Sequence, residues 1–133
     1  MKSRSTPDTY AWYSPTTGNH YNIAITLPTP LGITAYFYAM INTGADDFVI
    51  SDAYLSDFFP GGIPTTTVPI TTAGGIFHMP IVKGHSFSVD GVTVTADIVF
   101  SASLTKSAAL CGRVPLMGCS TKFGLRSTEL LRV

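Results

Sequence analysis

Short β-prone runs recur along the whole chain, and residues that favour turns separate them. The clearest hairpin signal is the pair Asp90-Gly91, because both residue types adopt the positive φ angles that a two-residue hairpin turn requires. Short strands at close spacing, punctuated by Gly and Pro, predict an all-β barrel or sandwich. The runs that we interpret as strands are residues 21–27, 33–41 and 47–51, two strands within 65–84, and the two arms of 85–101.

The length of 133 residues predicts a single domain. We expect that domain to occupy residues 21–133, after an N-terminal arm, residues 1–20, that is rich in Ser, Thr, Pro and Gly. The apolar and aromatic content of residues 33–41 predicts a strand that is buried on both faces. Residues 125–133 are expected to form a terminal strand or a short tail.

Helical structure is expected in only two short segments. Residues 52–59 predict one helical turn with Asp52 as its N-cap. Residues 119–124 predict one or two turns that Gly124 closes. Both segments are too short to change the all-β prediction.

Charge is scarce, and this excludes some classes of protein. Only 12% of the residues are charged and the formal net charge is zero, whereas a nucleic-acid-binding domain normally carries a basic face. A hydrophobic content of 45% leaves room for a self-association surface. No run is long and apolar enough to insert into a membrane, and the first ten residues lack the apolar core of a signal peptide. The cellular compartment and release from a larger precursor stay open.

The cysteines and histidines indicate neither a metal nor a cofactor. Cys111 and Cys119 are the only cysteines, and we expect free thiols, although the sequence leaves a disulfide open. These residues and the three scattered histidines lack the spacing of metal ligands. No catalysis is assigned to His20, His78 or His85, because no Ser or Cys near them belongs to a recognisable nucleophile motif.

The stretch "AMINTGADDFVISD", residues 39–52, places a polar turn between two β-prone runs. Asn42, Thr43 and Gly44 lead into the adjacent carboxylates Asp46 and Asp47. Taken alone, Asn-Thr-Gly fits an ordinary β-turn, and the two acids fit solvated turn residues. Two further blocks of sequence decide against that reading.

Together, three blocks resemble the retropepsin-like aspartic peptidases, the class that includes retroviral proteases. In that family the active-site loop reads Asp-Thr-Gly-Ala-Asp, and residues 42–46 here read Asn-Thr-Gly-Ala-Asp. The block "TTAGGIFHMPIV", residues 71–82, is similar to the family's flap, a β-hairpin with a Gly-rich tip. The block "VPLMGCSTKFGL", residues 114–125, is similar to its C-terminal strand, Gly and helix. The resemblance implies a closed β-barrel with a flap hairpin and one short C-terminal helix.

The family's chemistry implies a homodimer that acts on polypeptide. Two facing carboxyl groups share one proton, so that one activates a water molecule and the other protonates the substrate. This chain holds a single such loop, since no other Asp or Asn precedes Thr-Gly or Ser-Gly. Each chain of a dimer would therefore contribute one loop at the two-fold axis.

The resemblance also assigns site residues. Asn42, Thr43 and Gly44 take the catalytic loop positions, with the Thr hydroxyl bonding across to the partner loop and the Gly allowing close approach. The expected substrate-binding residues lie on the loop, at the flap tip and on a wall loop. In the flap tip, both glycines are expected to bend at positive φ. The substrate-binding set is Ala45, Asp46, Asp47, Gly74, Gly75, Ile76, Val114, Pro115 and Leu116.

Two positions depart from the family pattern. An Arg often follows the Gly of the C-terminal block and braces the active-site loop, but Cys119 stands there, which leaves Arg113 or Arg126 as replacements. The larger departure is Asn42, because an amide cannot act as a base. We favour a deliberate Asp-to-Asn change that inactivates an endopeptidase. A naturally non-catalytic peptide-binding or dimerisation module on the same fold stays open, as does an unrelated β-barrel with a chance motif.

Overall fold

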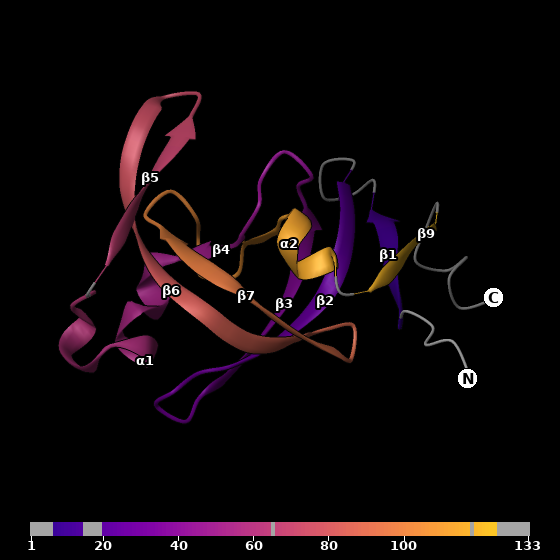
Figure 1. The fold of residues 1–133 in the computed structure, drawn as a ribbon, viewed down its shortest axis with the longest axis horizontal. Helices are drawn as coiled ribbons and strands as arrows, with labels where there is room; N and C mark the ends of the chain where they lie inside the picture. Colours follow the sequence, from indigo (N-terminus) through magenta and orange to yellow (C-terminus); the bar gives the residue numbers. More distant parts are fainter. Residues whose placement is uncertain (1–6, 15–19, 65, 118, 125–133) are drawn as a thin grey trace, which may run out of the picture.

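The computed structural model describes residues 7–14, 20–64, 66–117 and 119–124, and most of them lie in β-strands (Figure 1). Helical structure in this part is confined to four short segments: η2 (Asp52–Tyr54), α1 (Leu55–Phe58), η3 (Pro60–Gly62) and α2 (Arg113–Leu116). The strands are β1 (Asp8–Ser14), β2 (His20–Pro28), β3 (Thr34–Ile41), β4 (Phe48–Ser51), β5 (Thr67–Thr72), β6 (Gly75–Val89), β7 (Val92–Ser101), β8 (Ala109–Cys111) and β9 (Ser120–Gly124).

All described strands belong to one sheet in the order β5-β6-β7-β4-β8-β3-β2-β1-β9. The pairs β4–β7, β3–β8 and β1–β9 are parallel and the other pairs are antiparallel. β6 also pairs with β2, through Ile25 opposite Val89 and Thr26 opposite Ser88. The all-β class is therefore what the sequence predicted, while a closed barrel as such stays a prediction.

The core lies on one face of β2 and β3 and continues beneath β4, β6 and β7. In β3, burial alternates from Thr34 to Ala39, and Tyr36 and Tyr38 are 75% and 74% exposed while Phe37 between them is buried. The expectation that both faces of 33–41 are buried is therefore wrong, because one face of an antiparallel pair can remain in contact with water. Phe37, Phe48 and Phe87 pack in the centre, with Phe48 stacked on Phe87 at 5.0 Å between ring centroids.

The hairpins follow the turn chemistry of the sequence. Asp90 and Gly91 have φ angles of 47° and 82°, which confirms the predicted turn between β6 and β7. The predicted boundary between residues 84 and 85 is wrong, because β6 runs without interruption from Gly75 to Val89. An irregularity in register falls at that point, where the N–H of Gly84 donates to Asp97 Oδ1 at 2.9 Å.

Two helical predictions need correction. Ser51, and not Asp52, caps η2, since the Ser51 hydroxyl oxygen accepts from the N–H of Ala53 at 3.1 Å. Residues 120–124 form β9 instead of a helix, because β1 offers them a parallel strand partner from the other end of the chain. The short helix near the C-terminus is α2, at Arg113–Leu116.

One end of the sheet is a projecting hairpin, and the other end is formed by strands from near the two chain termini. Figure 1 shows the β5–β6 hairpin reaching away from the rest of the molecule, while β1 and β9 lie side by side at the opposite end. β1 pairs with both β2 and β9, so part of the expected N-terminal arm belongs to the sheet.

The domain boundary at residue 20 stays a prediction, and residues 125–133 lie outside the described residues. No helix in the described part of the chain is long and apolar enough to cross a membrane.

Candidate active site

The loop from Asn42 to Asp47 joins β3 to β4 in a tight turn. The N–H of Asn42 donates to the carbonyl oxygen of Cys111 on β8 at 2.9 Å, and the N–H of Ala45 donates to the carbonyl oxygen of Asn42 at 3.1 Å. The Asn42 side-chain oxygen Oδ1 accepts from the N–H of Gly44 at 3.1 Å. A carboxylate oxygen would accept the same hydrogen bond, so the loop conformation is one that Asp also supports.

The segment that leads from β8 into α2 supports this loop through backbone hydrogen bonds. The N–H groups of Gly112, Arg113 and Val114 donate to the carbonyl oxygens of Asp47, Ala45 and Asp46, each at 2.9 Å. Gly112 permits this approach because it has no Cβ. A Cβ there would lie 2.5 Å from the carbonyl oxygen of Asp47 and 2.6 Å from the carbonyl carbon of Asp46. The loop of Asn42 to Asp47 and the start of α2 therefore form one hydrogen-bonded unit.

Arg113 also contacts the loop with its side chain. Its guanidinium donates to Asp46 Oδ1 from Nη2 and, at 3.1 Å, from Nε. Both side chains are largely exposed, at 62% and 60%, so this ion pair orients Asp46 more than it stabilises the fold. Of the two arginines that the sequence analysis offered as replacements for the family's bracing residue, Arg113 contacts the loop and Arg126 lies outside the described residues, and the correspondence of Cys119 to the family position stays a prediction. Cys119 is instead buried with its thiol directed to the carbonyl oxygen of Leu116.

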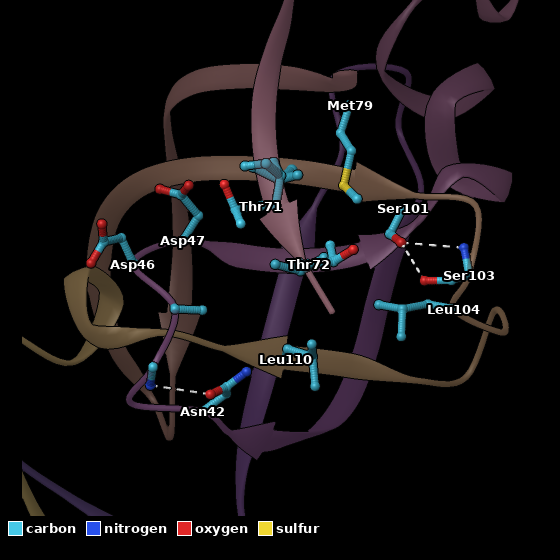
Figure 2. A pocket seen from close by; sticks show the side chains of 15 residues that line it. Asn42, Asp46, Asp47, Thr71, Thr72, Met79, Ser101, Ser103, Leu104 and Leu110 are labelled. Carbon is cyan, nitrogen blue, oxygen red and sulfur yellow. Dashed lines mark hydrogen bonds between the residues drawn. The ribbon is translucent and has the colours of Figure 1, made fainter. Parts of the chain in front are cut away.

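A cleft of about 400 Å³ lies over the loop (Figure 2). One wall comes from the loop, a second from β5 and β6, and a third from the end of β7 and the residues that follow it. Five residues predicted for the site line this cleft together, namely Asn42, Gly44, Ala45, Asp46 and Asp47. The remaining lining residues, which the sequence analysis missed, are Val49, Ile70, Thr71, Thr72, Met79, Val99, Ser101, Ser103, Leu104 and Leu110.

Those missed residues come from separate strands that only the sheet brings together, so no local motif marks them. Gly112 is different, because the pair Gly112-Arg113 directly follows the apolar strand β8 and was visible in the sequence. The resemblance placed the corresponding glycine at Gly118, six residues before Gly124, and therefore did not single out Gly112. The structure does not describe Gly118.

The other predicted site residues do not line the cleft in this chain. Thr43 is exposed in the turn, and Gly74, Gly75 and Ile76 are exposed at the tip of the β5–β6 hairpin. Gly75 has a φ of 122°, but Gly74 does not adopt a positive φ, so only one of the two glycines is needed for the bend. Val114, Pro115 and Leu116 belong to α2 and are likewise absent from the cleft lining. Their roles toward a substrate stay predictions.

The electrostatics of the cleft centre on Asp47. Partial burial raises the pKa of this carboxyl above 3.8, and the nearby carboxyls of Asp97 and Asp46 raise it further, while Lys83 opposes them. The cleft therefore combines an amide at the end of β3 with a carboxyl that holds its proton more tightly than usual. Among the described residues, no group of three His, Cys, Asp or Glu side chains is arranged to hold a metal ion.

No family model matches the sequence, and no curated protein matches it. Among solved structures, the chain is similar to the solution structure of simian foamy virus (mac) protease, with a TM-score of 0.49 and 19% sequence identity. The aligned part covers 72% of this chain and 91% of the viral protease. A likeness at this level establishes neither a family nor an activity for this chain.

Proposed function

We propose that this chain is the subunit of a homodimeric retropepsin-like aspartic endopeptidase in which Asn42 stands at the catalytic aspartate position, so that the protein binds extended peptides without cleaving them. The observation that carries this proposal is the loop of Asn42 to Asp47. It lines a cleft beside a projecting β-hairpin, and the Gly112-Arg113 segment holds it in place. An ordinary surface turn needs none of these features.

The chemistry explains why the residue at position 42 decides the activity. With Asp at this position in both copies, one carboxylate would take a proton from a water molecule while the other, protonated, would donate to the peptide group. The hydroxide would add to the carbonyl carbon. The C–N bond would then break as the nitrogen takes up the proton that a carboxylate had removed from the water molecule. The amide of Asn42 has no such proton to exchange and no charge with which to activate water.

Peptide binding does not depend on that carboxylate. The cleft wall offers apolar side chains such as Val49 and Ile70, and hydroxyl groups such as those of Thr71 and Ser103. Apolar walls with a few polar groups are typical of pockets that accept the side chains of a ligand. Asn42 and Asp have nearly the same shape, so the substitution preserves this surface.

The test is the Asn42→Asp variant, assayed against a peptide library with mass spectrometric detection of cleavage. We expect hydrolysis to rise by at least about a hundredfold over the Asn42 protein, the usual contribution of acid–base catalysis. A statine-type inhibitor should block it. The matched control is Asn42→Ala, which alters the same side chain without supplying a carboxyl group and should remain inactive.

Two results would contradict the proposal. One is efficient cleavage by the Asn42 protein after its intact mass excludes deamidation. The other is a folded, dimeric Asn42→Asp variant that cleaves none of the library. If that inactive variant still bound peptides, the naturally non-catalytic peptide-binding module would be the better description.

A further inference from the structure

A second pocket lies where β6 and β7 separate. The two strands pair in antiparallel register up to Ile81 opposite Val99. Continuing this register would place Met79 opposite Ser101 and Phe77 opposite Ser103, but β6 diverges from β7 there and pairs only with β5 among the described strands. The space between the strands is a pocket of about 420 Å³, lined by residues 77–80 of β6 and residues 100–103 at the end of β7.

We call this space between β6 and β7 the fork. Among the described residues, neither strand has a strand partner on the edge that faces it. On its other edge, β6 pairs with β5 through this stretch, with Ile70 opposite Phe77 and Thr67 opposite Pro80. β7 pairs with β4 on its other edge, with Ser51 opposite Ser101. Open strand edges that face a pocket are the usual docking place for an extended peptide, which adds backbone hydrogen bonds to them.

The fork pocket adjoins the candidate active-site cleft. Thr72, Met79, Ser101 and Ser103 line both spaces, and Figure 2 shows Met79, Ser101 and Ser103 along one side of the cleft. Ser101 and Ser103 are joined through their hydroxyl groups at 2.8 Å, and the N–H of Ser103 donates to Ser101 Oγ at 3.2 Å. A peptide that leaves the cleft over this wall would therefore enter the fork directly.

The chemistry of the fork lining favours a basic side chain. Among the described residues that line it, Asp52, which is exposed, is the one carboxylate, His78 is the only other titratable residue, and none is Lys or Arg. Phe77, whose side chain is half exposed, and Met79 offer apolar surface for the aliphatic stem of Lys or Arg. A guanidinium could also lie against the Phe77 ring while it bonds to the carboxylate.

We infer that the fork between β6 and β7 is an additional peptide subsite, in which one end of the bound peptide lies as an extended strand and places a Lys or Arg side chain beside Asp52. The inference rests on the proposed function, because it extends the same peptide beyond the cleft. It predicts a substrate preference for a basic residue outside the segment that occupies the cleft.

The experiment compares peptides by calorimetry with the Asn42 protein, which should not cleave them. The first probe is a cleft-binding peptide of about six residues taken from the library. The others extend it at either end by about three residues, with Ser-Ser-Arg or Ser-Ser-Glu as the added sequence. We expect the Arg extension at one end to tighten binding by about threefold, as for an exposed charge pair, because Asp52 is itself exposed, and the Glu extension to give no gain.

Two variants locate this gain. Asp52→Asn should abolish most of it and leave the affinity for the six-residue peptide unchanged, whereas Asp57→Asn on α1, which does not line the fork, should leave both intact. Ala102→Phe fills the fork from an exposed position and should also remove the gain. The inference is overturned, with the proposed function intact, if the short peptide binds but no extension tightens binding, or if the gain survives in Asp52→Asn. A protein that binds none of the peptides overturns both.

Discussion

Asn42 fits its turn as well as an aspartate would. Its side-chain oxygen accepts from the N–H of Gly44, and its backbone is tied to Cys111 and Ala45. None of these hydrogen bonds requires a negative charge or a titratable proton. Under the proposed function, Asn42 keeps the shape of the loop and lacks the proton and charge that acid–base catalysis needs.

Asp47 is the residue whose charge costs the folded state free energy. Because burial, Asp97 and Asp46 raise its folded-state pKa above 3.8, the folded protein binds this proton more tightly than the unfolded chain. As pH rises from that value through the raised folded-state pKa, the free energy of unfolding falls. Asp47→Asn should therefore increase stability at neutral pH, by less than about 1 kcal/mol because the group is partly exposed, and the gain should vanish at low pH.

Urea unfolding followed by Trp12 fluorescence, at a series of pH values and one protein concentration, measures this difference. Asp57→Asn is the control, since that acid lies on α1 and does not line the cleft. A loss of stability in Asp47→Asn that grows with pH would contradict the electrostatic assignment.

At the scale of elements, backbone groups hold the loop of Asn42 to Asp47 against the start of α2. Three backbone hydrogen bonds join them, and the missing Cβ of Gly112 allows the contact. Gly112→Ala should force the loop and α2 apart and lower the free energy of unfolding by about 2 kcal/mol, as overpacking does. In the Asn42→Asp background, the same substitution should also reduce peptide cleavage.

Gly74→Ala is the matched control for that prediction. Gly74 also lies in a segment predicted for the site, but a Cβ there would meet only ordinary contacts, the nearest being a Phe77 ring atom at 3.6 Å. Its effect on stability should stay within about 0.5 kcal/mol. Thermal unfolding of both variants measures the two losses of stability. Equal losses would show that the close approach at Gly112 is not what positions the loop.

At the scale of the whole molecule, the proposal requires two copies, because one chain supplies one loop. We expect the Asn42 protein to be a dimer at tens of micromolar, with residues 42–44 at the two-fold axis, and its dissociation constant to vary little with pH. The Asn42→Asp dimer should weaken by up to about tenfold between about pH 5 and pH 7.5, because the two facing carboxyls repel once both lose their protons.

Sedimentation of both proteins at the two pH values is the measurement. A purely monomeric Asn42 protein would contradict the dimer, and an Asn42→Asp dimer that tightens with pH would contradict the placement of residue 42 at the axis. Residues 125–133, which we also expect in or near the interface, lie outside the described residues, so their part in the dimer is a prediction from sequence alone.

The sequence by itself determined the features that depend on neighbouring residues. The Asp90-Gly91 turn, the β-prone runs that become β2 and β4, and the polar turn of Asn42 to Asp47 between two such runs all follow from local turn chemistry and side-chain propensity, which act within a few residues. The adjacent residues Gly112 and Arg113 could also be read from the sequence, but the sequence alone did not indicate which arginine contacts the loop.

Only the tertiary structure decided the features that depend on distant partners. Residues 120–124 became a strand because β1 lies beside them, and Tyr36 and Tyr38 stayed exposed because no second layer covers that face of β3 in the described chain. The cleft and the fork take their lining from strands far apart in sequence, and the pKa of Asp47 responds to Asp97, which is fifty residues away along the chain. Such effects arise from packing between elements, and a local sequence pattern does not predict which elements will pack against each other.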